Sequence, residues 1–361
     1  MSLIGISFFL LSFSCQKDFS AISKKIPNNK PDTTSHDFSW KIDTLGELSS
    51  TLNDISVISE SDIWAVGEIH TPDTDKFDSL GHWIPPFNAA HWDGQEWKMV
   101  RTEAPGYGFG TNFSVYTFEP NNIWIGGGIP QRWDGNSWTF YGSSSGYPGG
   151  FRINKIWGTS SSNLYFVGDE GNIFHYNGST WQKLSNGTNI DLYDVWGSPD
   201  GELIWACGYS SNYSESILLQ YNGSDFRTVW QGNFQQGITD STYEGLLSSL
   251  WVVDSDSLIV IGGDGIFYQD IQGNAPPLKS NINLNAFPNS VRGSAPNNIF
   301  IVGFDGSVWH YNGSTWKTYP ELRNPKWVFK SVAVLDNKVV AVGLDYSHGI
   351  QREIILTGLK P

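Results

Sequence analysis

The chain has 361 residues and a formal net charge of −14, from 36 acidic and 22 basic residues. Proteins that bind nucleic acid normally carry a basic stripe, so this balance disfavours DNA or RNA as a partner. Aromatic residues make up 15% of the chain and 39 residues are glycine, which is typical of packed β-sheets with many tight turns, and no long apolar pattern of helical period occurs.

The first element of the chain is the apolar run Leu3–Phe13, followed by Ser14 and Cys15. A run of 11 residues is too short to span a bilayer and predicts a secretory signal peptide over residues 1–14. A cysteine directly after a small residue resembles a bacterial lipobox, so we expect Cys15 to be lipidated. A plain cleaved signal peptide is the alternative.

Residues 15–37 follow as a polar, proline-containing stretch without periodicity, which predicts a flexible tether behind the lipid. The expected location is the bacterial cell envelope, with the protein anchored to the outer membrane by its lipid alone. A secreted protein is the alternative.

One hexapeptide recurs along the rest of the chain: YNGSTW stands at Tyr176–Trp181 and again at Tyr311–Trp316. Asn-Gly and Asp-Gly tolerate positive φ at both central positions of a type I′ turn, so each copy predicts a tight hairpin between an aromatic strand end and the next strand. Near-copies lie at Trp92–Trp97, Trp133–Trp138 and Tyr221–Phe226.

A glycine near the end of every second strand sets the period of the repeat. These glycines are separated by 60, 41, 40, 54, 41 and 40 residues. A period near 40 with four short strands per unit is the pattern of a β-propeller blade, and seven glycines predict seven blades. The glycines are Gly67, Gly127, Gly168, Gly208, Gly262, Gly303 and Gly343.

The repeat resembles that of bacterial secreted seven-bladed propellers with VWG, VWAVG and HYNGxxW motifs, which are kelch-like and YCF48-like in style. The resemblance covers residues 38–361 and implies the fold, whereas propellers carry many unrelated functions. Gly-Gly pairs of the kelch type occur only at Gly126-Gly127 and Gly262-Gly263, and the Gly-His and Trp-Asp framing of WD40 blades is missing.

The seventh unit ends after three strands, so its fourth strand must come from elsewhere. The segment Phe38–Thr44, FSWKIDT, looks like the missing outer strand. We therefore expect an all-β seven-bladed propeller over residues 38–361, of four-stranded antiparallel blades, in which the N-terminal strand completes the last blade and leaves no open sheet edge. We expect a monomer.

Several residues tempt a metal or redox interpretation. His91, His175 and His310 recur at one repeat position, but other blades hold Arg132 or Gln220 there, which favours a structural role. The loop with Asp73, Asp75 and Asp78 resembles a calcium loop without a closing Glu, and whether it binds calcium stays open. Cys207 falls where other blades have valine and is expected to be a small buried hydrophobe. No cofactor is predicted.

No nucleophile triad, carboxylate pair or phosphate loop is recognisable in the sequence. A sialidase-like site would need several converging arginines, and only Arg292 lies within an inner strand, with Arg152 just before another. A catalytic site on the long loops stays possible, so an extracytoplasmic carbohydrate-active enzyme, a hydrolase or lyase, is the alternative function.

The longer connections all join strands two to three or one blade to the next, which places them on one face of the disc. Function tends to lie on loops that a rigid scaffold holds. The insertions are Glu68–Asn88, Thr102–Asn112, Gly142–Phe151, Tyr209–Ser216 and Gln231–Leu247.

These loops are rich in aromatic residues, which stack on sugars or anchor protein partners. The sequence therefore predicts a non-enzymatic binding propeller whose ligand is a protein or a glycan. The expected ligand-binding residues are Trp83, Tyr107, Phe109, Tyr147, Phe151, Tyr209, Tyr213 and Tyr243, and the same loops also hold Phe87 and Phe234.

Overall fold

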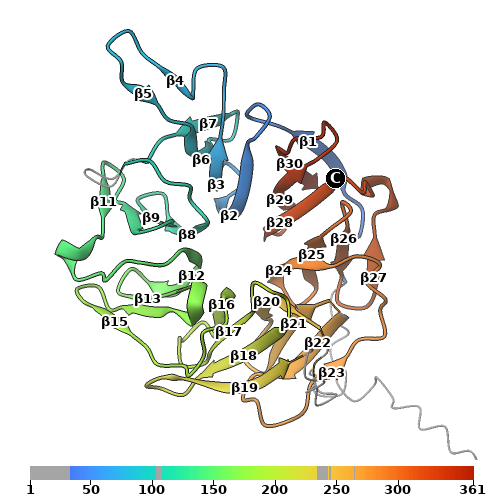
Figure 1. Cartoon of the computed structure of the whole chain (residues 1–361). Helices are drawn as coiled ribbons and strands as arrows, with labels where there is room; N and C mark the ends of the chain where they lie inside the picture. The colour runs from blue at the N-terminus through green and yellow to red at the C-terminus, as the bar shows by residue number, and fades with distance from the viewer. Residues whose placement is uncertain (1–32, 103–107, 234–242, 244, 264) are drawn as a thin grey trace, which may run out of the picture. The chain divides into compact units, whose positions relative to one another are not determined.

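The computed structural model describes residues 33–102, 108–233, 243, 245–263 and 265–361. Within these residues the chain forms seven four-stranded antiparallel sheets arranged around a ring (Figure 1). The predicted seven-bladed propeller is therefore confirmed. In each blade the first strand is innermost, and the innermost strands of neighbouring blades contact one another all round the ring.

The first four blades are listed here from the innermost strand outward. Blade 1 has β2 (Thr51–Ser59), β3 (Asp62–Ile69), β6 (Phe87–Trp92) and β7 (Trp97–Val100); blade 2 has β8 (Ser114–Glu119), β9 (Asn122–Gly126), β10 (Pro130–Trp133) and β11 (Trp138–Phe140); blade 3 has β12 (Ile153–Ser160), β13 (Asn163–Gly168), β14 (Ile173–Tyr176) and β15 (Trp181–Lys183); blade 4 has β16 (Leu192–Gly197), β17 (Ile204–Tyr209), β18 (Glu215–Tyr221) and β19 (Phe226–Asn233).

The remaining three blades follow the same plan. Blade 5 has β20 (Leu247–Val252), β21 (Ser257–Gly262), β22 (Gly265–Asp270) and β23 (Leu278–Lys279); blade 6 has β24 (Pro288–Ala295), β25 (Asn298–Gly303), β26 (Val308–Tyr311) and β27 (Trp316–Thr318); blade 7 has β28 (Trp327–Val334), β29 (Lys338–Asp345), β30 (Arg352–Leu359) and β1 (Ser39–Asp43). A separate hairpin, β4 (Lys76–Phe77) and β5 (Trp83–Ile84), projects from blade 1 (Figure 1).

The N-terminal strand closes the ring as predicted, because β1 pairs antiparallel with β30 over its whole length. The Trp40 ring packs edge-on against Tyr319 at 4.8 Å between centroids, which ties blade 7 to blade 6. Contacts of this segment begin before the predicted boundary at Phe38, since Thr34 N–H donates to the Asn312 carbonyl at 3.1 Å.

The recurrent hairpins form as predicted, but their turn is not type I′. Among Asn177–Thr180 only Gly178 has positive φ, at +93°, and a turn with positive φ at its first central residue alone is type II′. The Asn177 side chain instead accepts the backbone N–H groups of Ser179 and Thr180 at 3.0 and 2.8 Å. The same bonds recur at Asp93, Asp134, Asn222 and Asn312.

The hydrophobic core lies between the blades, where each sheet packs face to face on the next. Between blades 4 and 5, for example, Trp205 and Cys207 pack with Leu250 and Val260, all fully buried. Burial raises the pKa of the Cys207 thiol well above its usual value, so this residue acts as the small buried hydrophobe expected from the sequence.

Candidate functional site: the channel mouth

In six of the seven described blades, the repeated glycine lies against the backbone that leads into the innermost strand, where a side chain would clash. A side chain on Gly168 would place its Cβ 1.9 Å from the carbonyl oxygen of Arg152. At this close approach the inner strand contains one extra residue: Ile153 pairs with Gly168 and Lys155 with Val167, so Asn154 is bulged out of the ladder. A bulge of this kind re-aims side chains at a sheet edge.

The bulge recurs beside the repeated glycine in six of the seven blades that the structure describes. Its extra residue lies at the start of the innermost strand, so the six residues meet around the axis of the ring. They are Asn53, Asn154, Tyr193, Ser248, Asn289 and Lys330, and blade 2 contributes Phe113 at the same place.

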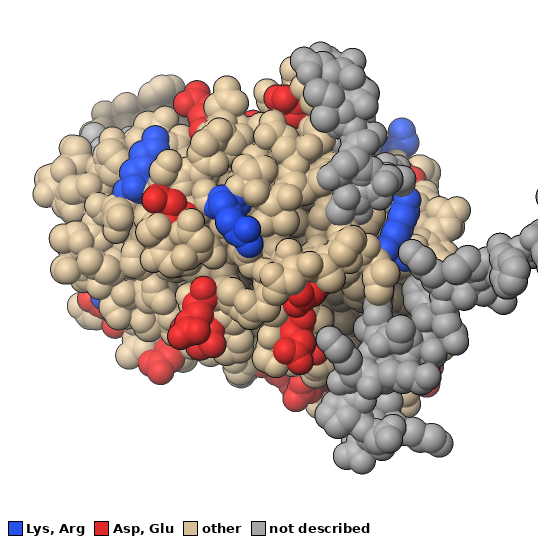
Figure 2. Space-filling view, turned by 90° about the horizontal axis from the view of Figure 1, so that it is seen from below, with Lys and Arg blue, Asp and Glu red and all other residues tan. Residues whose placement is uncertain are grey.

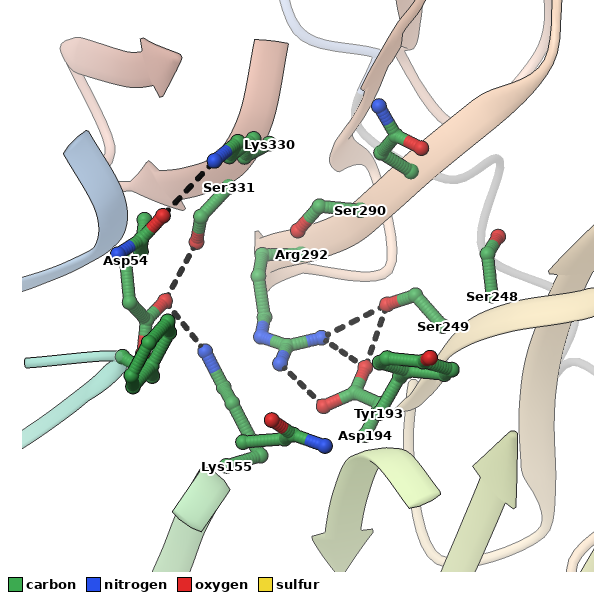
Figure 3. A pocket seen from close by; sticks show the side chains of 14 residues that line it. Asp54, Lys155, Tyr193, Asp194, Ser248, Ser249, Ser290, Arg292, Lys330 and Ser331 are labelled. Atoms are coloured by element: carbon green, nitrogen blue, oxygen red, sulfur yellow. Dashed lines mark hydrogen bonds and ion pairs between the residues drawn. The ribbon is translucent and has the colours of Figure 1, made fainter. Parts of the chain in front are cut away.

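Together with the residues that follow them, these side chains line a cavity of about 60 Å³ at the mouth of the central channel (Figure 3). Each inner strand begins directly after a blade-to-blade connection, and the cavity lies where these strands begin. It therefore opens on the face that carries the long loops. We call this region the channel mouth.

A buried ion pair crosses the channel mouth between blades 4 and 6. Arg292 binds both carboxylate oxygens of Asp194, at 2.7 and 2.9 Å (Figure 3). Burial alone would raise the pKa of Asp194, yet the Arg292 guanidinium holds that pKa below its usual value. Ser249 of blade 5 donates to the same carboxylate at 2.5 Å. The pair is thus fully hydrogen-bonded, as a buried charge requires.

A second ionic cluster joins blades 1, 3 and 7. Asp54 accepts bonds from the Lys155 ammonium and the Ser331 hydroxyl, each at 2.6 Å. It also accepts the backbone N–H of Val115 in blade 2 at 3.0 Å. Together the two clusters include a residue from each of the seven inner strands.

Lys330 also lines the cavity, but it belongs to neither of these ionic clusters. Among the described residues its ammonium bonds only the neutral Asn53 amide oxygen, at 2.8 Å. Burial, and then the positive charge of Arg152, lowers the pKa of Lys330 to about 8. Lys155, Arg292 and Lys330 thus face two carboxylates, three positive charges against two, which leaves one net positive charge in an acidic protein.

A row of aromatic rings leads from the channel mouth across blades 4 to 6. Tyr193 packs on Tyr209 at 4.4 Å between ring centroids, and Tyr209 contacts Tyr213 at 5.9 Å. Tyr209 also contacts Phe287 at 6.5 Å, and Phe287 contacts Phe304 at 6.0 Å. Tyr213 and Phe304, at the outer ends, are 65% and 44% exposed. We call these five residues the aromatic track.

The predicted ligand-binding aromatics separate into two groups. Tyr209 and Tyr213 belong to the aromatic track, and Trp83 is exposed on the β4–β5 hairpin beside Phe109. Tyr147, Phe151 and Tyr243 are instead buried, because their rings pack into the hydrophobic clusters between neighbouring blades. Tyr107 and Phe234 lie outside the described residues, and Phe87 lies under the Arg101 guanidinium.

The acidic loop and the repeated histidines are engaged locally. Asp73 pairs with Lys76, Asp75 with His70, and Asp78 caps the hairpin turn through the N–H of Leu80. The histidines bond an Asn or Asp at the start of the neighbouring strand in the same blade, the structural role expected for them. These bonds are His91 to Asp62, His175 to Asn163 and His310 to Asn298. No cluster of three metal-ligating side chains occurs among the described residues.

The channel mouth was not predicted from the sequence, although a signal for it exists. One polar position recurs 13 residues before the repeated glycine in four blades, as Asp54, Lys155, Ser249 and Ser290. An alignment of the units on their glycines would have brought them together.

Several proteins of known sequence or structure are similar to this chain. No protein-family model matches it. Over 186 residues it is 24% identical to the immune protein Tsi7 of Pseudomonas aeruginosa, a match that covers 50% of this chain and 56% of that protein. The chain thus spans about half the length of this curated relative.

The solved structures that resemble it are propellers. YCF48 bound to D1 peptide has a TM-score of 0.63 at 18% identity, covering 93% of this chain and 100% of that one. The WD40 propeller domain of Doa1 gives 0.59 at 14%, covering 90% and 98%. A catalytically inactive virginiamycin B lyase from Staphylococcus aureus with quinupristin gives 0.62 at 10%, covering 89% and 99%. At such identities the likeness establishes the fold alone, a seven-bladed β-propeller.

Proposed function

We propose that this protein is a non-enzymatic binding propeller that docks a segment of a protein partner across the channel mouth and the aromatic track. The observation that carries the proposal is the continuity of the two: Tyr193 both lines the cavity and begins the track. Exposed aromatic rings beside a polar, charged cavity suit a peptide, which presents apolar side chains and polar groups in alternation.

Two comparisons are consistent with a protein partner. One similar propeller was solved with a peptide bound, and the weak sequence relative is named an immune protein. A glycan would also stack on aromatic rings, but only the Tyr209–Tyr213 pair of the track is stacked. The other pairs are tilted or edge-on, so the track is not one flat platform.

The charged groups of the channel mouth suit binding better than proton transfer. Glycoside hydrolysis needs one carboxyl group that keeps its proton. Here both carboxylates, Asp54 and Asp194, are held by cations and hydroxyls. This arrangement favours a fixed electrostatic surface, and an enzyme of the carbohydrate-active type remains the less favoured function.

Photo-crosslinking tests the proposal directly. A benzoylphenylalanine placed at Tyr213 or Phe304 in the full chain should crosslink a partner segment in the native cells. The same group at Ser179 or Ser314, on the opposite face, should not. Equal labelling from both faces would contradict the proposal, and specific binding on a glycan array without any protein crosslink would replace it with sugar recognition.

The proposed location is the bacterial cell envelope, with Cys15 as the lipidated residue. Its support is the sequence pattern of an apolar run ending in Ser14-Cys15. None of the helices in the described part of the chain is long and apolar enough to cross a membrane. Cys15→Ser should move the protein from the membrane fraction to the soluble fraction, since two acyl chains provide stable anchoring. A wild-type protein that partitions into the aqueous phase of a detergent extraction would contradict the lipid anchor.

A further inference from the structure

We propose that the channel mouth is a carboxylate-binding well, in which the Lys330 ammonium and the Ser290 hydroxyl hold one carboxylate of the bound partner. This inference rests on the proposed function and names the group that the partner presents. The well takes either an acidic side chain or the free carboxyl end of a chain, because both offer the same two oxygens.

Among the described residues, Lys330 is the cation of the channel mouth that bonds no carboxylate. Asp54 and Asp194 are occupied by Lys155 and Arg292, with Ser331 and Ser249 as further donors. Lys330 has three N–H donors, and among the described residues only the neutral Asn53 oxygen accepts from it. A bound carboxylate would supply the missing negative charge.

A hydroxyl group also lines the well and is available to a ligand. Ser290, in β24, is 5% exposed, and its hydroxyl faces the cavity without a hydrogen-bond partner among the described residues (Figure 3). Its neighbours are satisfied: Ser248 donates to the Pro288 carbonyl at 2.6 Å, and Asn289 to the Phe329 carbonyl at 2.8 Å. The Ser290 hydroxyl is therefore accessible from the cavity and can bond whatever occupies it, a water or a ligand.

The cavity is small, at about 60 Å³, and most of its lining side chains are polar. A carboxylate presents only two oxygens and suits such a small polar cavity end-on. The rest of the partner would then lie outside the well, where the aromatic track begins at Tyr193.

The surroundings favour a carboxylate over a cation. Arg152 lies close enough to Lys330 to lower its pKa, and the two buried ion pairs contribute no net charge. On the outer surface seen in Figure 2, by contrast, acidic and basic side chains are scattered among uncharged ones and form no continuous basic patch. Among the described residues that line the well, no carboxylate bonds the positive charge of Lys330.

Thermal unfolding with small carboxylates at constant ionic strength tests the inference. Acetate should raise the melting temperature of the full chain in a saturable way compared with chloride. Lys330→Met and Ser290→Ala should each weaken acetate binding, the first by about tenfold or more because a charged hydrogen bond is lost. Lys338→Met is the matched control. Lys338 begins β29 of the same blade, on the face opposite the channel mouth, and its ammonium bonds the Glu60 carbonyl.

Two further probes separate the possible sources. N-acetylglycine carries a free carboxyl end, and the α-amide of N-acetylglutamate carries only a side-chain carboxylate. The probe that binds more tightly shows whether the partner presents a chain end or an acidic side chain. Acetate that stabilises wild type and Lys330→Met equally, or neither, would overturn the well. If Lys330→Met fails to fold, Ser290→Ala decides alone. Saturable acetate binding without any crosslink from Tyr213 would support the carboxylate-binding well and contradict the proposal that the partner is a protein.

Discussion

At one end of the blades, the strands of five hairpins are joined by the same turn, in which an Asn or Asp side chain accepts two backbone N–H groups and the next residue is glycine. At the other end, the connections range from a few residues to the β4–β5 hairpin. Yet a repeat exists there as well, because six blades share the glycine and the bulge beside it.

The two ends differ in what the repeat prescribes. On the face that carries the five shared turns, which we call the turn face, the repeat prescribes side chains, since the Asn or Asp and the glycine after it make the turn. On the channel-mouth face it prescribes only the backbone, and the bulged residue varies from Ser248 to Tyr193 to Lys330. Constant backbone with variable side chains is the arrangement expected of a surface that recognises something.

The largest effect should come from opening the ring. Deleting residues 1–44 removes β1 and Trp40 and exposes the edge of β30, so we expect a fall in melting temperature of more than about 10 °C or outright aggregation. Deleting residues 1–29 should leave the melting temperature unchanged. Equal melting temperatures for the two truncations would show that β1 is not needed for closure.

Breaking the ion pair of the channel mouth should come next. Arg292→Ala leaves the Asp194 carboxylate buried without its cation, which typically costs about 3–5 kcal/mol in the free energy of unfolding. Lys98→Ala removes the partner of Asp93 on the turn face, where both groups are solvated, and should change stability little. Urea unfolding measures both, and similar losses would remove the energetic distinction between the faces.

A smaller effect concerns the histidine pair that joins the N-terminal segment to blade 6. The Nδ1 atoms of His36 and His310 are 2.9 Å apart, and burial, then His36, lowers the pKa of His310 to about 3. Because this pKa lies below the unfolded value of about 6.5, the unfolded chain binds more protons and stability falls as pH drops below about 6.5.

This term amounts to about 2 kcal/mol between pH 7 and pH 5. His310→Gln should abolish it, since Gln220 occupies the same repeat position in blade 4 without a titratable group. Urea unfolding at the two pH values measures the difference. Parallel losses in the variant and the wild type would contradict the role assigned to His310.

The propeller was predictable from the sequence because its signals are local. They are the hairpin turn at Asn177, the repeated glycine at Gly168 and the N-terminal strand at Trp40, which precedes the first complete repeat. The turn type was wrong, since Asn177 acts through its side chain rather than through positive φ. The channel mouth was missed because its residues lie far apart in sequence and meet only once the ring has closed.

The aromatic residues show the other limit. Composition alone does not distinguish Tyr213, which is 65% exposed, from Tyr243, which is 1% exposed and donates to Gln269. Both stand in long loops of the same face. Whether such a ring packs inward depends on the side chains that the neighbouring blades place around it, as they do around Tyr243, and no short stretch of sequence records them.

The most direct test of the account is the affinity of the crosslinked partner for variants of the two faces. Tyr213→Ala and Phe304→Ala should each weaken binding by about 1–3 kcal/mol if these rings anchor the partner, without changing the melting temperature. Ser179→Ala and Ser314→Ala should bind like the wild type. Losses from the turn-face variants, with no loss from the aromatic track, would show that recognition lies on the other face and would contradict the account.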